Sequence, residues 1–235
     1  MDVIAPPALE EAKNTLSSKL VDSLREEILS GRLPSGSKLN VEKIRRTLGV
    51  SLSPLREALA RLIAVGLVAL HDNKGYSVSC TSLENLQEIT QLRIELESTA
   101  LRYAIERGDL NWESDVMRAL YKLNRIVRDK RDANSLEAWE KAHRQFHVSL
   151  IIGCNMPMML NFCEVLHNLN DRYRRMFLVA SGGDRNVAAE HTEIAEAAVA
   201  RDSAAACDKL REHIRRTGTN LKRSLADKVT LQIQS

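Results

Sequence analysis

The sequence predicts a mainly α-helical protein in two parts, a small N-terminal domain over residues 1–80 and an all-helical bundle over residues 81–235. Apolar residues recur three and four positions apart along most of the chain, and this spacing is typical of helices with one buried face. The alternation typical of strands occurs only around residues 68–78, which predicts a single β-hairpin at the end of the first domain.

The composition limits the kinds of partner and compartment. The formal net charge is only +3, from 34 basic and 31 acidic residues, so an anionic partner must be bound by a local patch. We expect a cytoplasmic protein without membrane contact, because the chain shows neither a signal-peptide pattern nor a long apolar segment. Four cysteines without a Cys-x-x-Cys pair indicate reduced thiols rather than disulfides, a thiolate zinc site or a catalytic cysteine.

Two helices are predicted first, after a disordered leader. Residues 16–30 carry apolar side chains at helical spacing, and Gly31 ends this helix. A turn containing proline and glycine follows, and residues 40–48 then form a second helix that ends at Gly49.

The third predicted helix has the sequence "SLSPLREALARL" over residues 51–62. Its N-cap is Ser51 or Ser53, and Pro54 is tolerated in the first turn because its missing N–H would be unpaired there. Leu55, Ala58, Leu59 and Leu62 form the buried stripe. Since only Gly49 and Val50 join this helix to the preceding one, the pair is a helix-turn-helix.

A hairpin follows the third helix. Val68 and Leu70 alternate with polar residues before a turn at residues 73–75, and Tyr76 and Val78 do so after it. Three helices and a hairpin wing describe a winged helix-turn-helix, in which the exposed side chains of residues 51–61 are free to enter a DNA major groove.

The remaining chain is predicted to be wholly helical. Thr81 and Glu84 indicate a capping box at the start of a long helix that reaches about residue 107. Further helices are expected over residues 112–130, 135–152, 156–180, 186–201 and 203–226.

Four histidines lie on the apolar faces of three of these helices. They are His143 and His147, one turn apart, then His191 and His213. A lone histidine on such a face is more often a hydrogen-bonded core residue, but four that can converge predict a site for a divalent metal. All-nitrogen ligation favours Zn²⁺ or Ni²⁺ over Mn²⁺. His167 is a weaker substitute ligand.

Arg93 is a second anomaly of the bundle, because it lies on an apolar stripe where an unpaired charge is costly. One interpretation is an intrahelical ion pair with Glu97, four residues later. The other is that the guanidinium binds the carboxylate of a ligand.

Several motifs resemble a known family of bacterial repressors. "GVSLSPLREALARLIAVGLV" together with "GYSV" is similar to the DNA-binding pattern of the GntR family. The later segments "QLRIELESTALRYA", "HRQFHVSLIIGC", "EHTEIAEAAVARD" and "LREHI" resemble the FCD ligand-binding domain of its FadR subfamily. Within the subfamily, "HRQFHVSLIIGC" and "DRYRRMF" look most like the carbon-starvation-induced regulators of dicarboxylate and amino-acid catabolism.

The resemblance implies a DNA interface centred on Arg56, which would contact a guanine edge or a flanking phosphate. Ser51 and Ser53 would donate to phosphates at the helix start. Further backbone contacts would come from Arg45, Arg46, Lys74 and His71. The alternative is that these charges pair locally, with Arg56 bound to Glu57 or Glu42. The chain departs from the family at Leu52, where an arginine is common.

The resemblance also assigns the histidines and Arg93. His147, His191 and His213 match the three metal histidines of the family, while His143 replaces the usual aspartate and is either a fourth ligand or a group that hydrogen-bonds the effector. Arg93 matches an arginine that clamps a carboxylate. The implied effector is a small carboxylate, and the subgroup resemblance favours a dicarboxylate.

Together these features predict a transcriptional regulator rather than an enzyme. We expect a homodimeric repressor of a catabolic operon that binds a palindromic operator in double-stranded DNA and responds to the carboxylate. One alternative is a helical metalloenzyme, although Glu140, Glu190 and Glu212 are expected to point away from the histidines. Another is a pure metal sensor, which would have no need of a buried Arg93.

Overall fold

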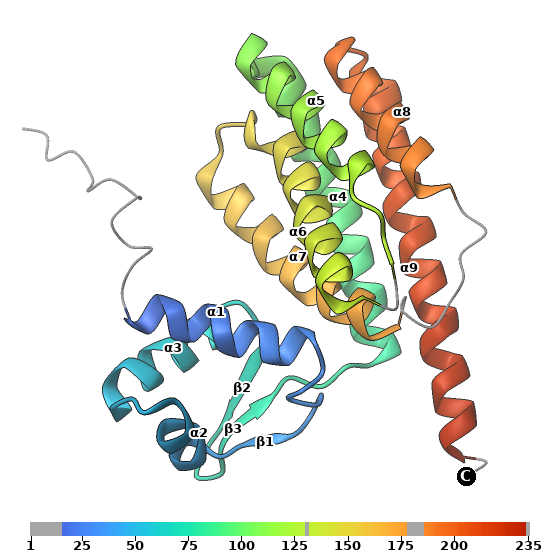
Figure 1. The fold of residues 1–235 in the computed structure, drawn as a ribbon. Coiled ribbons are helices and arrows are strands. Elements are labelled where there is room, and N and C mark those ends of the chain that lie inside the picture. Colours follow the sequence, from blue (N-terminus) through green and yellow to red (C-terminus); the bar gives the residue numbers. More distant parts are fainter. Residues whose placement is uncertain (1–15, 130–131, 178–185, 234–235) are drawn as a thin grey trace, which may run out of the picture. The chain divides into compact units, whose positions relative to one another are not determined.

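A computed structural model describes residues 16–129, 132–177 and 186–233 (Figure 1). The leader expected to be disordered lies outside these residues. The chain divides into two compact units, one ending at Thr81 and the other beginning at Ser82.

The N-terminal unit is a winged helix-turn-helix. It contains α1 (Leu16–Leu29), β1 (Lys38–Leu39), α2 (Val41–Leu48), α3 (Leu52–Ala64), β2 (Val68–His71) and β3 (Gly75–Val78). The strands form an antiparallel sheet in the order β1-β3-β2, and all three are labelled in Figure 1. The predicted hairpin is confirmed, but its loop is 72–74 and Gly75 pairs with His71 as the first residue of β3. Strand β1 was not predicted, because two residues are too few to show alternation.

The core of this unit is the predicted one. Leu55, Ala58, Leu59 and Leu62 are all completely buried. Gly49 ends α2 with a left-handed φ of 64°, a conformation that glycine adopts without strain, and this sets the short connection to α3. Of the two predicted N-caps of α3, Ser51 is the one observed.

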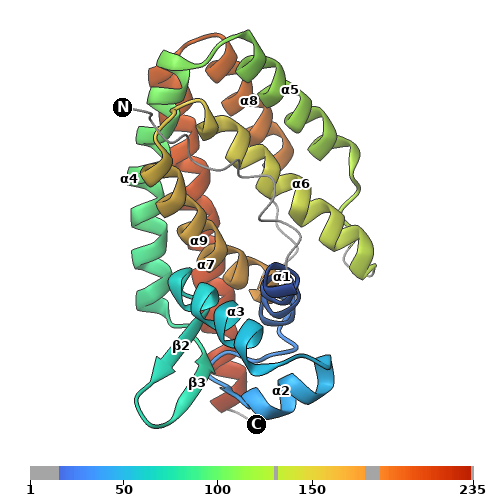
Figure 2. The ribbon, with the colours of Figure 1, turned by 90° about the vertical axis from the view of Figure 1, so that its left-hand side faces the viewer.

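The C-terminal unit is wholly helical in the part that the structure describes. Its helices are α4 (Leu83–Arg107), α5 (Leu110–Arg125), α6 (Ala133–Ile152), α7 (Pro157–Phe177), α8 (Val187–Val199) and α9 (Ser203–Ile233). Helix α4 packs along α7 and α9, α5 packs on α6, and α8 packs on α9 (Figure 2). The core lies between these pairs and includes Leu101, Val116, Phe146, Ile194 and Leu210.

The start of α4 differs from the prediction. Its N-cap is Ser82 and not Thr81, since the Ser82 hydroxyl accepts the N–H of Asn85 at 3.1 Å. Thr81 instead donates its N–H to the Ser35 hydroxyl at 2.9 Å. Among the described helices of both units, none combines the length and apolar character needed to cross a bilayer.

Candidate metal centre and nucleic-acid interface

The start of helix α3 presents the predicted DNA-binding side chains to solvent. Ser51 is exposed and caps the helix through its backbone conformation only, because its hydroxyl makes no capping hydrogen bond. Ser53 and Arg56 are exposed as well. Arg56 forms no hydrogen bond or ion pair with any residue that the structure describes, so the local pair with Glu57 or Glu42 is not found.

Arg45 and Arg46 on α2 are engaged with the same carboxylate. Arg45 Nη2 lies 2.7 Å from Glu42 Oε1, and Arg46 Nε lies 2.8 Å from that oxygen. These hydrogen bonds lower the pKa of Glu42 to about 2. Both arginines are therefore locally paired in the free protein, through exposed ion pairs of the kind that contribute little to stability and exchange readily for another anion.

The wing carries the other two predicted contacts. Lys74 is exposed in the loop between β2 and β3. His71 Nε2 lies 2.7 Å from the Ser77 hydroxyl, across the two paired strands. The imidazole is thus held against the hairpin and not extended from it.

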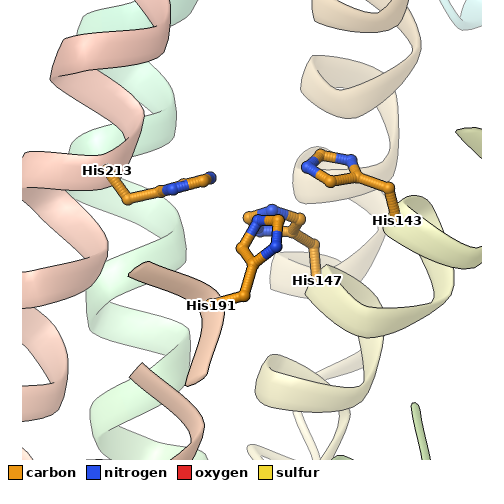
Figure 3. A group of neighbouring side chains, drawn as sticks. All are labelled: His143, His147, His191 and His213. Atoms are coloured by element: carbon orange, nitrogen blue, oxygen red, sulfur yellow. The ribbon is translucent and has the colours of Figure 1, made fainter. Parts of the chain in front are cut away.

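Four histidines converge in the bundle. One ligand atom from each of His143, His147, His191 and His213 can be chosen so that all lie within 4.8 Å of one another, and all four residues are buried. They come from α6, α8 and α9, and Figure 3 shows their rings directed at a common point. These are the four histidines that the helical spacing singled out. His167, on α7, is buried but is not a member of the group.

The donor set fits a cation. Burial lowers the pKa of His143 and His147 well below the ordinary value, with the charge of Arg174 adding to the effect at His143 and those of His213 and His191 at His147. Both rings are therefore neutral, as metal ligation requires. Neither nitrogen of His147 has a hydrogen-bond partner among the described residues. Buried polar atoms are normally satisfied, and a bound cation would satisfy one of these two nitrogens.

Glu190 orients one of the rings, which the sequence did not predict. His213 Nδ1 lies 2.9 Å from Glu190 Oε2, and Arg216 Nη1 lies 3.1 Å from the other oxygen of that carboxylate. A proton on Nδ1, donated to Glu190, leaves the lone pair of His213 on Nε2. The expectation that Glu190 points away from the histidines was wrong. Its carboxylate contacts a histidine on the next helix.

Arg93 is bound within its own helix. Its Nε and Nη2 donate to the two oxygens of Glu97 at 2.6 and 3.3 Å, and both residues are buried. This is the intrahelical ion pair named above as one interpretation. Glu97 also lies 3.0 Å from His167 Nε2 and 4.0 Å from His147 Nδ1, so the pair adjoins the histidine cluster.

A second buried network of charges lies in the same unit. Arg174 Nη2 lies 2.5 Å from Glu140 Oε2 and 2.9 Å from Asp171 Oδ1. Arg144 Nε lies 3.3 Å from Asp171 Oδ2, while Arg128 Nη2 lies 3.7 Å from Glu140 Oε1. Burial raises the pKa of Glu140. Burial acts in the same direction at Asp171, but Arg144 and Arg174 outweigh it and lower the pKa of that carboxyl.

Glu140 corrects a second expectation from the sequence. It is buried, three residues before His143 on α6, and so shares the inward face of that helix. A glutamate in a helical pattern is ordinarily interpreted as solvent-exposed. The burial of Glu140 is explained by its ion pairs with Arg174 and Arg128, which lie outside α6.

A cavity of about 310 Å³ reaches the histidine cluster. His191 forms part of its wall, together with Arg128 and Trp139. The ring of Trp139 stacks on His143 at a centroid distance of 4.8 Å. A small molecule in this cavity would therefore be in contact with at least one member of the cluster.

A winged helix-turn-helix followed by a helical ligand-binding bundle defines a class of bacterial transcriptional regulators. Residues 16–78 match the bacterial regulatory proteins of the gntR family, and residues 88–216 match the FCD domain. The chain belongs to the GntR family and carries an FCD domain. Members of this family bind DNA, and FCD domains bind small-molecule effectors. The chain is a transcriptional regulator and not an enzyme, so the metalloenzyme alternative is dismissed.

Individual relatives agree with this assignment. The chain is 36% identical over 193 residues to BphR of Paraburkholderia xenovorans, an uncharacterized HTH-type transcriptional regulator, covering 81% of this chain and 79% of that protein. It is 30% identical over 197 residues to the HTH-type transcriptional repressor GlaR of Escherichia coli, covering 81% and 89%. The solved structure of E. coli McbR/YncC shares the fold, with a TM-score of 0.74 at 22% identity over 89% of this chain and 98% of that one.

Proposed function

We propose that the protein is a homodimeric repressor of a catabolic operon, whose affinity for a palindromic operator is changed by a small carboxylate bound at a metal in the helical bundle. The observation that carries the proposal is the convergence of four buried imidazoles from three helices. Repression is supported by GlaR, which is a repressor by name.

We assign His147, His191 and His213 as metal ligands and His143 as the fourth, because its ring lies in the same group. Four nitrogen donors suit Zn²⁺ or Ni²⁺. When bound, the metal would supply a Lewis-acidic positive charge that attracts a carboxylate oxygen. Glu190 keeps the ring of His213 in the orientation and tautomer that ligation needs.

Arg93 is assigned to the effector carboxylate. Its pair with Glu97 uses Nε and Nη2, so Nη1 is the atom that would donate to a ligand while the pair persists. Glu97 also lies close to His147 and His167. A carboxylate bound by Arg93 would therefore change the electrostatic environment of the histidine cluster.

The DNA interface is assigned to α3, α2 and the wing. Arg56 has no hydrogen-bond or ion-pair partner among the described residues and is the candidate for direct base or phosphate contact. Ser51 and Ser53 lie in the first turn of α3, where backbone N–H groups favour an anion. The phosphate contacts are completed by Arg45, Arg46, Lys74 and His71.

The proposal is tested by titrating the protein onto the DNA upstream of its own gene, in metal-loaded and chelator-stripped forms. We expect salt-sensitive, sequence-selective binding, because released counterions accompany phosphate contacts. A panel of small mono- and dicarboxylates is then screened by thermal shift. A shift that requires the metal, from a compound that also changes DNA affinity, supports the proposal. A change of DNA affinity with metal alone, and with no carboxylate, would instead establish a pure metal sensor.

A further inference from the structure

An exposed leucine lies in the first turn of helix α3, among the side chains assigned to DNA. Leu52 is the first residue of this helix and is 38% exposed. We propose that Leu52 contacts the C5-methyl group of a thymine in the major groove and thereby determines one base of the operator sequence. This inference rests on the proposed function, since it needs α3 in the major groove of the operator.

The exposure of Leu52 differs from that of the leucines that follow it at helical spacing. Leu55, Leu59 and Leu62 come three, seven and ten positions later, and each is completely buried in the core of this unit. Side chains of a helix lean toward its N-terminus, so that of Leu52 extends beyond the first turn. Leu52 therefore contributes to the surface at the N-terminal end of α3 and not to the core.

The neighbours of Leu52 on this surface are polar. Ser51 and Ser53 flank it in sequence, and Arg56 lies four positions later, on the adjoining part of the same helical face. All three are exposed. Among the described residues of α3, no other large apolar side chain is exposed. The end of the helix that would enter the groove therefore presents one apolar group beside groups that donate hydrogen bonds.

The base edges in the major groove offer one apolar group, the C5-methyl of thymine. The hydrogen-bonding groups of the other bases would lose water against a leucine without gaining a partner. Recognition helices contact base edges with their N-terminal residues, which is where Leu52 lies. Cβ atoms four positions apart on a helix are about 5–6 Å from each other. The thymine should therefore lie within about two base pairs of the base or phosphate that Arg56 contacts.

The test removes the methyl group from the DNA and the leucine from the protein. The full chain first selects an operator from a random library of double-stranded DNA. Each thymine of one half-site is then replaced in turn by deoxyuridine, which keeps the hydrogen-bonding groups and lacks only the methyl. We expect one replacement to weaken binding about fourfold, as the burial of a single methyl-sized group implies. Fluorescence anisotropy at a fixed salt concentration measures the affinities.

Leu52→Ala is the diagnostic variant. Position 52 is exposed and alanine is a good helix former, so we expect the variant to fold. It should bind the selected operator more weakly than the unmodified chain and bind the thymine and deoxyuridine forms equally well. Leu110→Ala is the matched control, because Leu110 is an exposed leucine at the first position of α5. It should retain the affinity and the full preference for thymine.

The results that would contradict the inference are distinguishable from a failure of the proposed function. If no deoxyuridine replacement weakens binding of the unmodified chain, Leu52 contacts no thymine methyl. If Leu52→Ala keeps the same preference for thymine, the methyl group is recognised by another residue or through the shape of the DNA. Both results leave the DNA interface on α3 intact. If the full chain selects no sequence from the library, the proposed operator binding and this inference are overturned together.

Discussion

Glu190 on α8 accepts a hydrogen bond from His213 on α9, with 2.9 Å between Oε2 and Nδ1. The carboxylate itself is held by Arg216. Removing it should release the ring and lower metal affinity by a factor of about 10 to 100. We expect Glu190→Ala to show this loss in competition titrations with a chelator. Glu193→Ala is the control, because Glu193 on the same helix is exposed and pairs with Lys209; equal affinities of the two variants would remove Glu190 from the site.

The metal-free protein should become less stable as the pH falls. Burial lowers the pKa of His143 and His147 in the folded state, so below about pH 6.5 the unfolded chain binds protons that the folded chain does not. Each histidine should then decrease the free energy of unfolding by about 1.4 kcal/mol per pH unit until its folded-state pKa is reached. Urea unfolding of chelator-stripped protein between pH 7.5 and 5.5 measures this slope, and His143→Asn should reduce it. A flat profile would show that the rings are protonated when folded.

Arg56→Ala should weaken operator binding by about 1–3 kcal/mol. If Arg56 contacts a phosphate, the slope of the logarithm of the binding constant against the logarithm of the salt concentration should also decrease by about 1. Arg56 is exposed and pairs with no residue in the described part of the chain, so its removal breaks no ion pair there. Arg32→Ala serves as the control, since Arg32 is exposed and paired with Glu27. Fluorescence anisotropy with operator DNA measures both; unchanged binding of Arg56→Ala would remove this residue from the interface.

Gly49→Ala should destabilise the N-terminal unit by about 1–2 kcal/mol, because a Cβ is disfavoured at a φ of 64°. Nothing lies within 4 Å of the position where that Cβ would stand, so the cost is one of backbone conformation alone. Asn tolerates left-handed backbone, and Gly49→Asn should therefore lose less. Thermal unfolding compares the stability of the two variants. An equal loss of stability in both would show that the left-handed backbone conformation is not the cause.

The features that the sequence predicted correctly are those that follow from the spacing of residues along a helix or strand. Four histidines at inward positions of three helices were found from spacing alone, and so were the buried stripe of α3 and the hairpin. Periodicity does not show which residue of a neighbouring helix a given side chain contacts. The contact of Glu190 with His213 and the burial of Glu140 against Arg174 depend on packing between helices, and a charged residue in a helical pattern is ordinarily interpreted as exposed.

The N-cap of α4 shows the same limit at the scale of one residue. Thr81 and Ser82 are adjacent and both are good capping residues. The choice is made by neighbours remote in sequence, since the Ser35 hydroxyl accepts the N–H of Thr81 and the Tyr173 hydroxyl accepts that of Ser82.

The N-cap of helix α3 is Ser51, and its hydroxyl accepts no hydrogen bond from the first N–H groups of the helix. A side-chain cap typically contributes about 1 kcal/mol to a helix. The free protein lacks that contribution, and a phosphate oxygen at the same place would restore it. The amide hydrogens in the first turn of α3 should therefore exchange readily in the free protein and slowly on DNA. Ordering of this turn would then be thermodynamically coupled to binding of the sugar–phosphate backbone.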